Sequence, residues 1–119
     1  MTYALLIYRT APPSVPIPEL EDRAALARHR QLQVEVEAMR QLRTVARLAD
    51  TSTAFTVRKA RGGAHDVSDG PFIETKEWLV GFYLVDCEDV EQALARARVI
   101  CPDEWHAIEV RPVTWQWKR

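Results

Sequence analysis

The sequence predicts an α+β fold in which two helices cover one face of an antiparallel sheet. Three observations predict it: apolar, strand-like stretches recur along the chain, two longer segments have helical periodicity, and turn residues separate neighbouring strands. The expected order of elements is β-α-β-β-(β)-β-α-β, which is that of a ferredoxin-like sandwich. The 119 residues are enough for one domain with one core, so we expect residues 1–119 to form a single domain.

The strands are expected at residues 3–9, 42–48, 53–60, 79–85 and 106–113, with a short extra strand at 64–68. The first is rich in Leu, Ile and Tyr, as buried strands are. Residues 50–52 and the pair Gly62-Gly63 supply turns on either side of the third strand. Gly81 lies inside a strand and therefore marks a close approach of backbone or ligand.

Two helices are expected between these strands. Pro18 suits the first position of a helix that runs to about Arg40. The apolar positions of this helix recur every three or four residues, and His29 completes their spacing, so this histidine is expected to face the sheet. The apolar positions are Ala25, Leu32, Val36 and Met39. Asp89 and Gln92 resemble a capping box at the start of the second helix, which Pro102 ends.

Composition excludes several classes of function. The net charge is −1 and no long basic block occurs, so nothing indicates binding to nucleic acid. No apolar run is long enough for a membrane span or a secretory signal, and we expect a cytoplasmic protein. Cys87 and Cys101 flank the second helix at about 18 Å from each other, which is too far for a disulfide.

Residues 69–77, Asp-Gly-Pro-Phe-Ile-Glu-Thr-Lys-Glu, combine a rigid turn with a dense set of polar groups. Gly70 can adopt a positive φ, and Asp69 can bond to the backbone ahead of it. This segment resembles the signature of the DGPF proteins of the YCII-related family. The resemblance covers nearly the whole chain, because residues 3–8, 79–86 and 108–113 are similar to strands of that family.

The resemblance implies an assembly and a site. It implies that two such sheets pack face to face as a dimeric α/β barrel. It also implies that a histidine of the first helix and an aspartate near the signature are catalytic, and these correspond to His29 and Asp69. A carboxylate bonded to one ring nitrogen would fix the tautomer and raise the basicity of the other nitrogen. Such a pair suits proton transfer, hydrolysis by activated water, or elimination.

Further candidates for ligand binding surround the signature and the strands beside it. They are Gly70, Pro71, Phe72, Glu74, Lys76, Val80, Gly81 and Arg47. Members of the family commonly have glycines near the positions of Val80 and Arg47, so this chain should have a narrower, more positive pocket. For Glu74 and Lys76, a solvated charge cluster or a salt bridge between subunits is the structural alternative. No phosphate loop, dinucleotide motif or metal-ligand spacing occurs, so neither cofactor nor metal is expected.

Three functions stay open. The first is a small homodimer that binds a small organic molecule, with His29 as the proton-transfer group, as a hydrolase or as a lyase or isomerase. The second is a non-catalytic ligand-binding or regulatory module, because the resemblance implies association with extracytoplasmic-function sigma factors. The third is a stable barrel dimer in which the signature only builds the fold.

Overall fold

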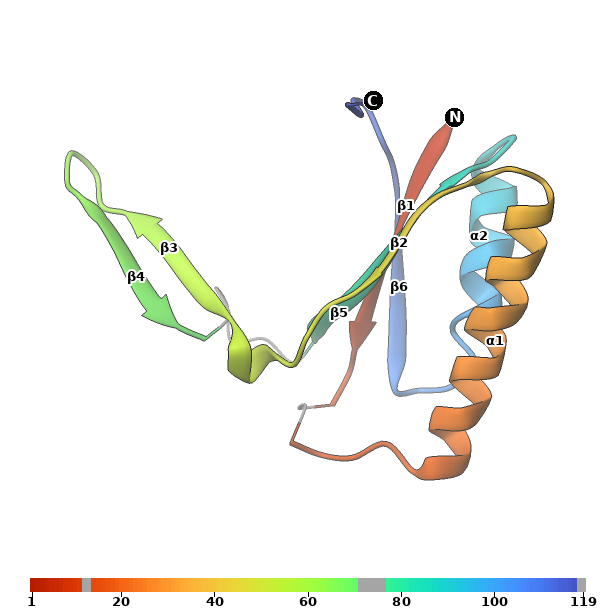
Figure 1. The fold of residues 1–119 in the computed structure, drawn as a ribbon, viewed down its shortest axis with the longest axis horizontal. Coiled ribbons are helices and arrows are strands. Elements are labelled where there is room, and N and C mark those ends of the chain that lie inside the picture. Colours follow the sequence, from red (N-terminus) through yellow and green to blue (C-terminus); the bar gives the residue numbers. More distant parts are fainter. Residues whose placement is uncertain (12–13, 71–76, 118–119) are drawn as a thin grey trace.

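The computed structural model describes residues 1–11, 14–70 and 77–117, and Figure 1 shows its fold. Its main sheet is antiparallel, with four strands in the order β2-β5-β1-β6. These strands are β1 (Thr2–Arg9), β2 (Leu42–Arg47), β5 (Trp78–Asp86) and β6 (His106–Pro112). Helices α1 (Glu19–Ala38) and α2 (Val90–Val99) complete the predicted ferredoxin-like α+β architecture. None of the helices in these ranges is long and apolar enough to cross a bilayer.

The core lies between the helices and one face of this sheet. Alternate residues of β1, Tyr3, Leu5 and Ile7, are buried, as the two-residue period of a strand requires. They pack in one cluster with side chains of β5, α1 and α2. The helix residues of that cluster are Leu32, Val36, Ala93, Ala97 and Ile100. Both helices therefore cover the same face, as the sequence predicts.

The opposite face of the sheet has apolar side chains that no helix covers. Leu6 is opposite Phe82 in the β1–β5 ladder, and Ala4 is opposite Leu84, so all four point to this face. Each is only half-buried. An apolar surface of this kind is typical of an interface.

The third expected strand exists but has another partner. It is β3 (Phe55–Lys59), and it pairs only with β4 (His65–Asp69) to form a separate two-stranded sheet. Residues 50–52 were expected to form a turn between strands, but the 3-10 helix η1 (Thr51–Thr53) occupies this segment and β2 pairs with β5. Figure 1 shows the β3–β4 hairpin projecting away from both helices.

Gly81 marks a close approach of backbone. A Cβ atom at this position would lie 2.7 Å from the carbonyl oxygen of Ala46 on β2, closer than real Cβ atoms come. The β1–β5 register also shifts here, between Ile7 and Tyr8. Val80 is the residue left over at this shift, and its side chain packs partly against the core.

The start of α2 is capped as expected, whereas the end of α1 differs from the expectation. Asp89 caps α2, because its side chain accepts a hydrogen bond from the backbone N–H of Gln92 at 2.8 Å. The Gln92 side chain in turn accepts from the N–H of Glu88. Met39 was expected on the buried face of the first helix, but it is 47% exposed, because α1 ends at Ala38 and Met39 is its C-cap.

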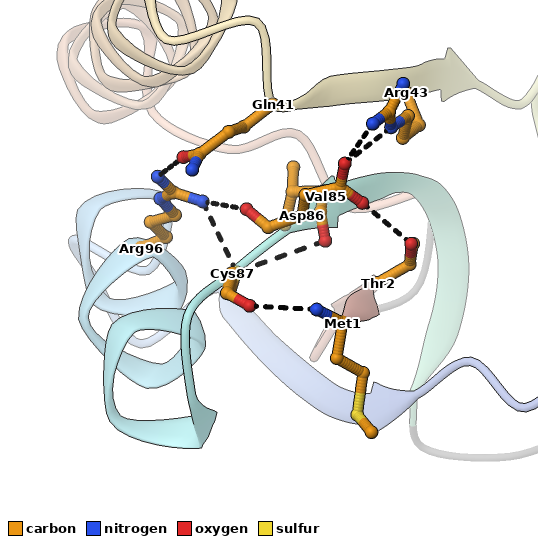
Figure 2. A network of polar contacts seen from close by, with 8 residues as sticks. All are labelled: Met1, Thr2, Gln41, Arg43, Val85, Asp86, Cys87 and Arg96. Atoms are coloured by element: carbon orange, nitrogen blue, oxygen red, sulfur yellow. Dashed lines mark hydrogen bonds and ion pairs between the residues drawn. The ribbon is translucent and has the colours of Figure 1, made fainter.

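A polar network at the end of β5 joins four parts of the chain (Figure 2). Arg96 of α2 is buried and donates to the carbonyl oxygen of Asp86 at 2.6 Å and to the side-chain oxygen of Gln41. The Asp86 carboxylate accepts from Thr2 at 2.7 Å and pairs with Arg43 of β2. The network therefore fixes α2, β1 and β2 to the same strand end.

The same region holds one of the two cysteines. Buried Cys87 lies within 3.3 Å of the Arg96 guanidinium, and burial raises the pKa of its thiol. Both Cys87 and Cys101 are unpaired thiols, which confirms the prediction that they form no disulfide.

Replacing Arg96 by Leu should lower the free energy of unfolding by about 3 kcal/mol, because two buried oxygen acceptors then lose their donor. Arg98→Leu is the matched control, since Arg98 is exposed on the same helix and should change stability by less than about 0.5 kcal/mol. Urea unfolding of the three proteins measures both effects. Equal stabilities of the two variants would show that the Arg96 contacts contribute nothing.

Candidate functional site

His29 lies on α1 against the helix-covered face of the sheet. Its ring is half-buried and stacks on the ring of Tyr83, with centroids 5.7 Å apart and planes 7° from parallel. The Nδ1 atom of His29 lies 2.8 Å from the Tyr83 hydroxyl oxygen. Tyr83 comes from β5 and is only 1% exposed. The prediction that His29 faces the sheet is therefore confirmed.

The Tyr83 hydroxyl determines which nitrogen of His29 carries the proton. Gln33 donates a hydrogen bond from Nε2 to this hydroxyl at 3.0 Å. The phenol has one hydrogen to donate, and its other partner is Nδ1 of His29. When Tyr83 donates to Nδ1, all three groups are satisfied and the neutral imidazole carries its proton on Nε2. The Nε2–H group then remains for another hydrogen bond.

The surroundings keep His29 neutral. Burial lowers the pKa of His29 below its ordinary value of 6.5, and the nearby charges of His106 and Arg47 lower it further. Burial raises the pKa of Tyr83, which outweighs the opposite effect of its bond with Gln33. The phenol therefore keeps its hydrogen at neutral pH and can donate it to His29.

Arg47, Val80 and Gly81 meet at the same end of the sheet. Arg47 is exposed on β2 and lies opposite Gly81 in the ladder. Its guanidinium has no ion-pair partner among the residues that the structure describes. The side chain of Val80 fills space beside the core. The charge of Arg47 acts on His29 and lowers its pKa.

Asp69 and Gly70 lie at the end of the hairpin. Gly70 has a φ of +95°, and its N–H donates to the Ala54 carbonyl at 2.7 Å, as expected of a turn glycine. Asp69 is exposed on β4 and lies opposite Phe55. His29 and Asp69, both within the described ranges, form no hydrogen bond or ion pair with each other in this chain.

Four predicted site residues, Pro71, Phe72, Glu74 and Lys76, lie outside the described residues. Their roles, and the catalytic roles of His29 and Asp69, stay predictions. No cluster of three or more His, Cys, Asp or Glu that could hold a metal ion occurs within residues 1–11, 14–70 and 77–117.

Sequence reasoning missed a second histidine–carboxylate pair. Nδ1 of His106 lies 2.8 Å from Oδ1 of Asp103, and both side chains are largely buried. The same oxygen accepts from the backbone N–H of Trp105 at 2.9 Å. His106 begins β6, at the start of the strand expected over residues 106–113. Its three-residue spacing from Asp103, just after Pro102, was the signal that could have found the pair.

Tyr83 and Gln33 were also missed. Gln33 follows His29 by four residues, so the two lie on one face of α1, and this spacing was visible in the sequence. Nothing local marked Tyr83, whose contact with His29 joins residues 54 positions apart.

The fold and the site define an α+β protein with a ferredoxin-like sheet and a half-buried histidine beneath its first helix. A model of the YCII-related domain matches residues 1–118, so the chain belongs to the YCII-related family. It is 36% identical over 115 residues to an uncharacterized protein of Rhizobium meliloti (strain 1021). The aligned residues make up 95% of this chain and 92% of that protein.

The lowered pKa of His29 should make stability depend on pH. The unfolded state, with a histidine pKa near 6.5, binds the proton more readily than the folded state. The free energy of unfolding should therefore fall as the pH drops from about 6.5 through the lower pKa of the folded state. His29→Gln should remove this part of the pH dependence, whereas His65→Gln, on the exposed hairpin, should keep it. Urea unfolding between about pH 5 and pH 8 measures the free energy of unfolding at each pH. If this free energy varies with pH in His29→Gln as it does in the wild type, the prediction is contradicted.

Proposed function

We propose that this protein binds a small organic molecule at His29 and transfers a proton to or from it. The observation that carries the proposal is the Tyr83 contact, which occupies Nδ1 of His29 and leaves Nε2–H available. A neutral histidine that donates from Nε2 can polarise a carbonyl and stabilise the negative charge that develops on its oxygen. This favours lyase or isomerase chemistry, with hydrolysis as the other reaction class.

The charge near His29 indicates the kind of ligand. The charge of Arg47 lowers the pKa of His29, and Arg47 is exposed to solvent. A guanidinium binds a carboxylate through two parallel hydrogen bonds, and a hydrogen bond to a charged group contributes about 1.5–3 kcal/mol. We therefore propose a ligand with a carboxylate or a similar anionic group. Asp69 and the signature turn are proposed to contact the ligand or a second subunit.

A screen of small organic acids by thermal shift tests the site. A ligand present at ten times its Kd adds about 1.4 kcal/mol, which raises Tm by roughly 5 °C. His29→Gln should abolish this shift, because the ring that donates to the ligand is gone. Arg30→Gln is the matched control, since Arg30 is exposed beside His29 on α1, and it should keep the shift.

If ligands shift the His29→Gln variant as much as the wild type, the site is elsewhere. If no acid shifts the wild type, the non-catalytic functions are favoured. Val80→Gly belongs in the same screen, because the smaller residue opens space at the β5 register shift. Responses of Val80→Gly that match those of the wild type across the library would show that Val80 does not restrict the ligand.

We propose that the active form is a homodimer in which the uncovered sheet faces pack together as an α/β barrel. Four half-buried apolar residues, Ala4, Leu6, Phe82 and Leu84, supply the interface. Trp115 and Trp117 follow β6 and are 76% and 69% exposed, so they would add aromatic surface to it. A specific interface of this kind buries more than about 1,000 Å².

Leu84→Arg should convert the dimer to a monomer, because it places a charge in the middle of the apolar face. Val34→Arg is the control: Val34 is 71% exposed on α1, away from the sheet, so this variant should remain a dimer. Sedimentation velocity at micromolar concentration distinguishes the two. A wild-type protein that sediments as a single monomeric species would contradict the proposal.

One observation supports a regulatory module as a second candidate. The β3–β4 hairpin exposes Phe55, Val57 and Val67, each more than 60% accessible. Val57 is opposite Val67, and Phe55 is two residues away on the same face, so the three form one apolar surface. A protein partner, such as the sigma factor that the family resemblance implies, would cover this surface. Binding of such a partner should survive His29→Gln and be lost when Val57 is replaced by Lys.

A further inference from the structure

The contact between Asp103 and His106 leaves Nε2 of His106 able to accept a proton. The Asp103 carboxylate can only accept hydrogen bonds, so the His106 nitrogen 2.8 Å away carries the hydrogen. The neutral imidazole of His106 therefore has its proton on Nδ1 and an unprotonated Nε2. The backbone N–H of Trp105 donates a hydrogen bond to the Asp103 carboxylate and holds it in place. This is the arrangement in which a carboxylate orients a histidine as a base.

The fold brings this pair to the same region as His29. His106 lies two residues before Ile108, which packs against the core, so both point to the helix-covered face of the sheet. Trp105, next to His106, donates from its indole nitrogen to the carboxylate of Glu21 on α1. Glu21, Ala25 and His29 follow one another at four-residue intervals and so share one face of α1. The charge of His106 is also close enough to act on His29.

The two histidines therefore present opposite groups. With Tyr83 as the donor to Nδ1, which satisfies the hydroxyl and Gln33 as well, the proton of His29 is on Nε2. His106 has its proton on Nδ1 because Asp103 accepts it. The former is a hydrogen-bond donor and the latter is a base. Two titratable groups that their neighbours hold in different states commonly divide the roles of acid and base.

We propose that His106 completes the site as its base, with Asp103 as its positioning residue and His29 as the donor that faces it. The ligand would be a small 2-oxo acid or a related carbonyl compound with an acidic hydrogen next to the carbonyl. This inference rests on the proposed function at His29 and assigns the second partner in its proton transfer.

The step is balanced without a co-reactant. Nε2 of His106 takes the proton from the carbon next to the carbonyl, and the electron pair of that C–H bond forms the double bond of an enolate. The negative charge moves to the carbonyl oxygen, which accepts the hydrogen bond from Nε2–H of His29. Arg47 holds the carboxylate of the ligand. Return of the proton from His106 to the enolate carbon regenerates the carbonyl compound, and its transfer to the enolate oxygen gives the enol. Either outcome restores both histidines.

Other charged and titratable groups also face the two rings. Tyr83 from β5 and Arg47 from β2 act on His29. Arg9 of β1 lies opposite His106 in the ladder, and the thiol of Cys101 donates to the His106 carbonyl oxygen at 3.4 Å. Asp103 is the carboxylate in contact with the His106 ring.

Long-range proton–nitrogen NMR of protein with 15N-labelled histidine tests the assignment. At pH 8, His29 should be neutral with its proton on Nε2, and His106 should be neutral with its proton on Nδ1. His106→Gln should raise the pKa of His29, because the positive charge that His106 carries when it is protonated is lost. His65→Gln, in the exposed hairpin, should leave it unchanged. The same tautomer in both rings, or an unchanged His29 in His106→Gln, would overturn the proposal.

Oxalate, which resembles the enolate of a 2-oxo acid, tests the ligand. It should shift the resonances of both histidines, and His106→Gln should weaken its binding at least about tenfold, the effect of one charge-assisted hydrogen bond. Shifts at His29 without shifts at His106 would overturn the role of His106 and leave the proposed site at His29 standing. Absence of oxalate binding would overturn the ligand class assigned here. A failure of the proposed function itself would appear as no response of His29 to any acid of the thermal-shift screen.

Discussion

The site depends on one buried hydroxyl group. Tyr83 is almost fully enclosed in the core, and a buried phenol without partners costs several kcal/mol. Helix α1 supplies both partners, His29 and Gln33, from positions one turn apart. This requirement fixes the rotation of α1 over the sheet and, at the same time, the tautomer of the histidine. A contact that satisfies a buried group of the core therefore also positions the ring of His29.

Strand β5 is the rigid base for this arrangement. At one end, Asp86 and Arg96 connect it to α2 and both neighbouring strands. At the other end, Gly81 allows the backbone of β2 to approach, and the register shift places Val80 against the core. Tyr83 lies between these two fixed points, so its hydroxyl has little freedom to move. A donor held in this way needs little reorganisation when a ligand binds.

Asp69 and Gly70, which begin the signature, lie at the end of the β3–β4 hairpin. Within the described residues the two strands of this hairpin pair only with each other, and an isolated two-stranded hairpin is marginally stable in water. The exposed apolar face of that hairpin and the uncovered face of the main sheet both offer surface to a partner. The helix-covered face holds the His29–Tyr83 contact, and the exposed apolar surfaces lie on other parts of the chain.

The sequence by itself determined the local features: the order of helices and strands, the Asp89 cap, the turn at Gly70, and the side of α1 on which His29 lies. Periodicity, capping and turn chemistry act within a few residues, so one sequence is enough to read them. Only the tertiary structure decided which groups meet. The Tyr83 contact to His29 and the position of His106 beside α1 both join segments that lie far apart in the sequence. The hydrophobic pattern that predicts each segment does not specify which polar atoms come together when those segments pack.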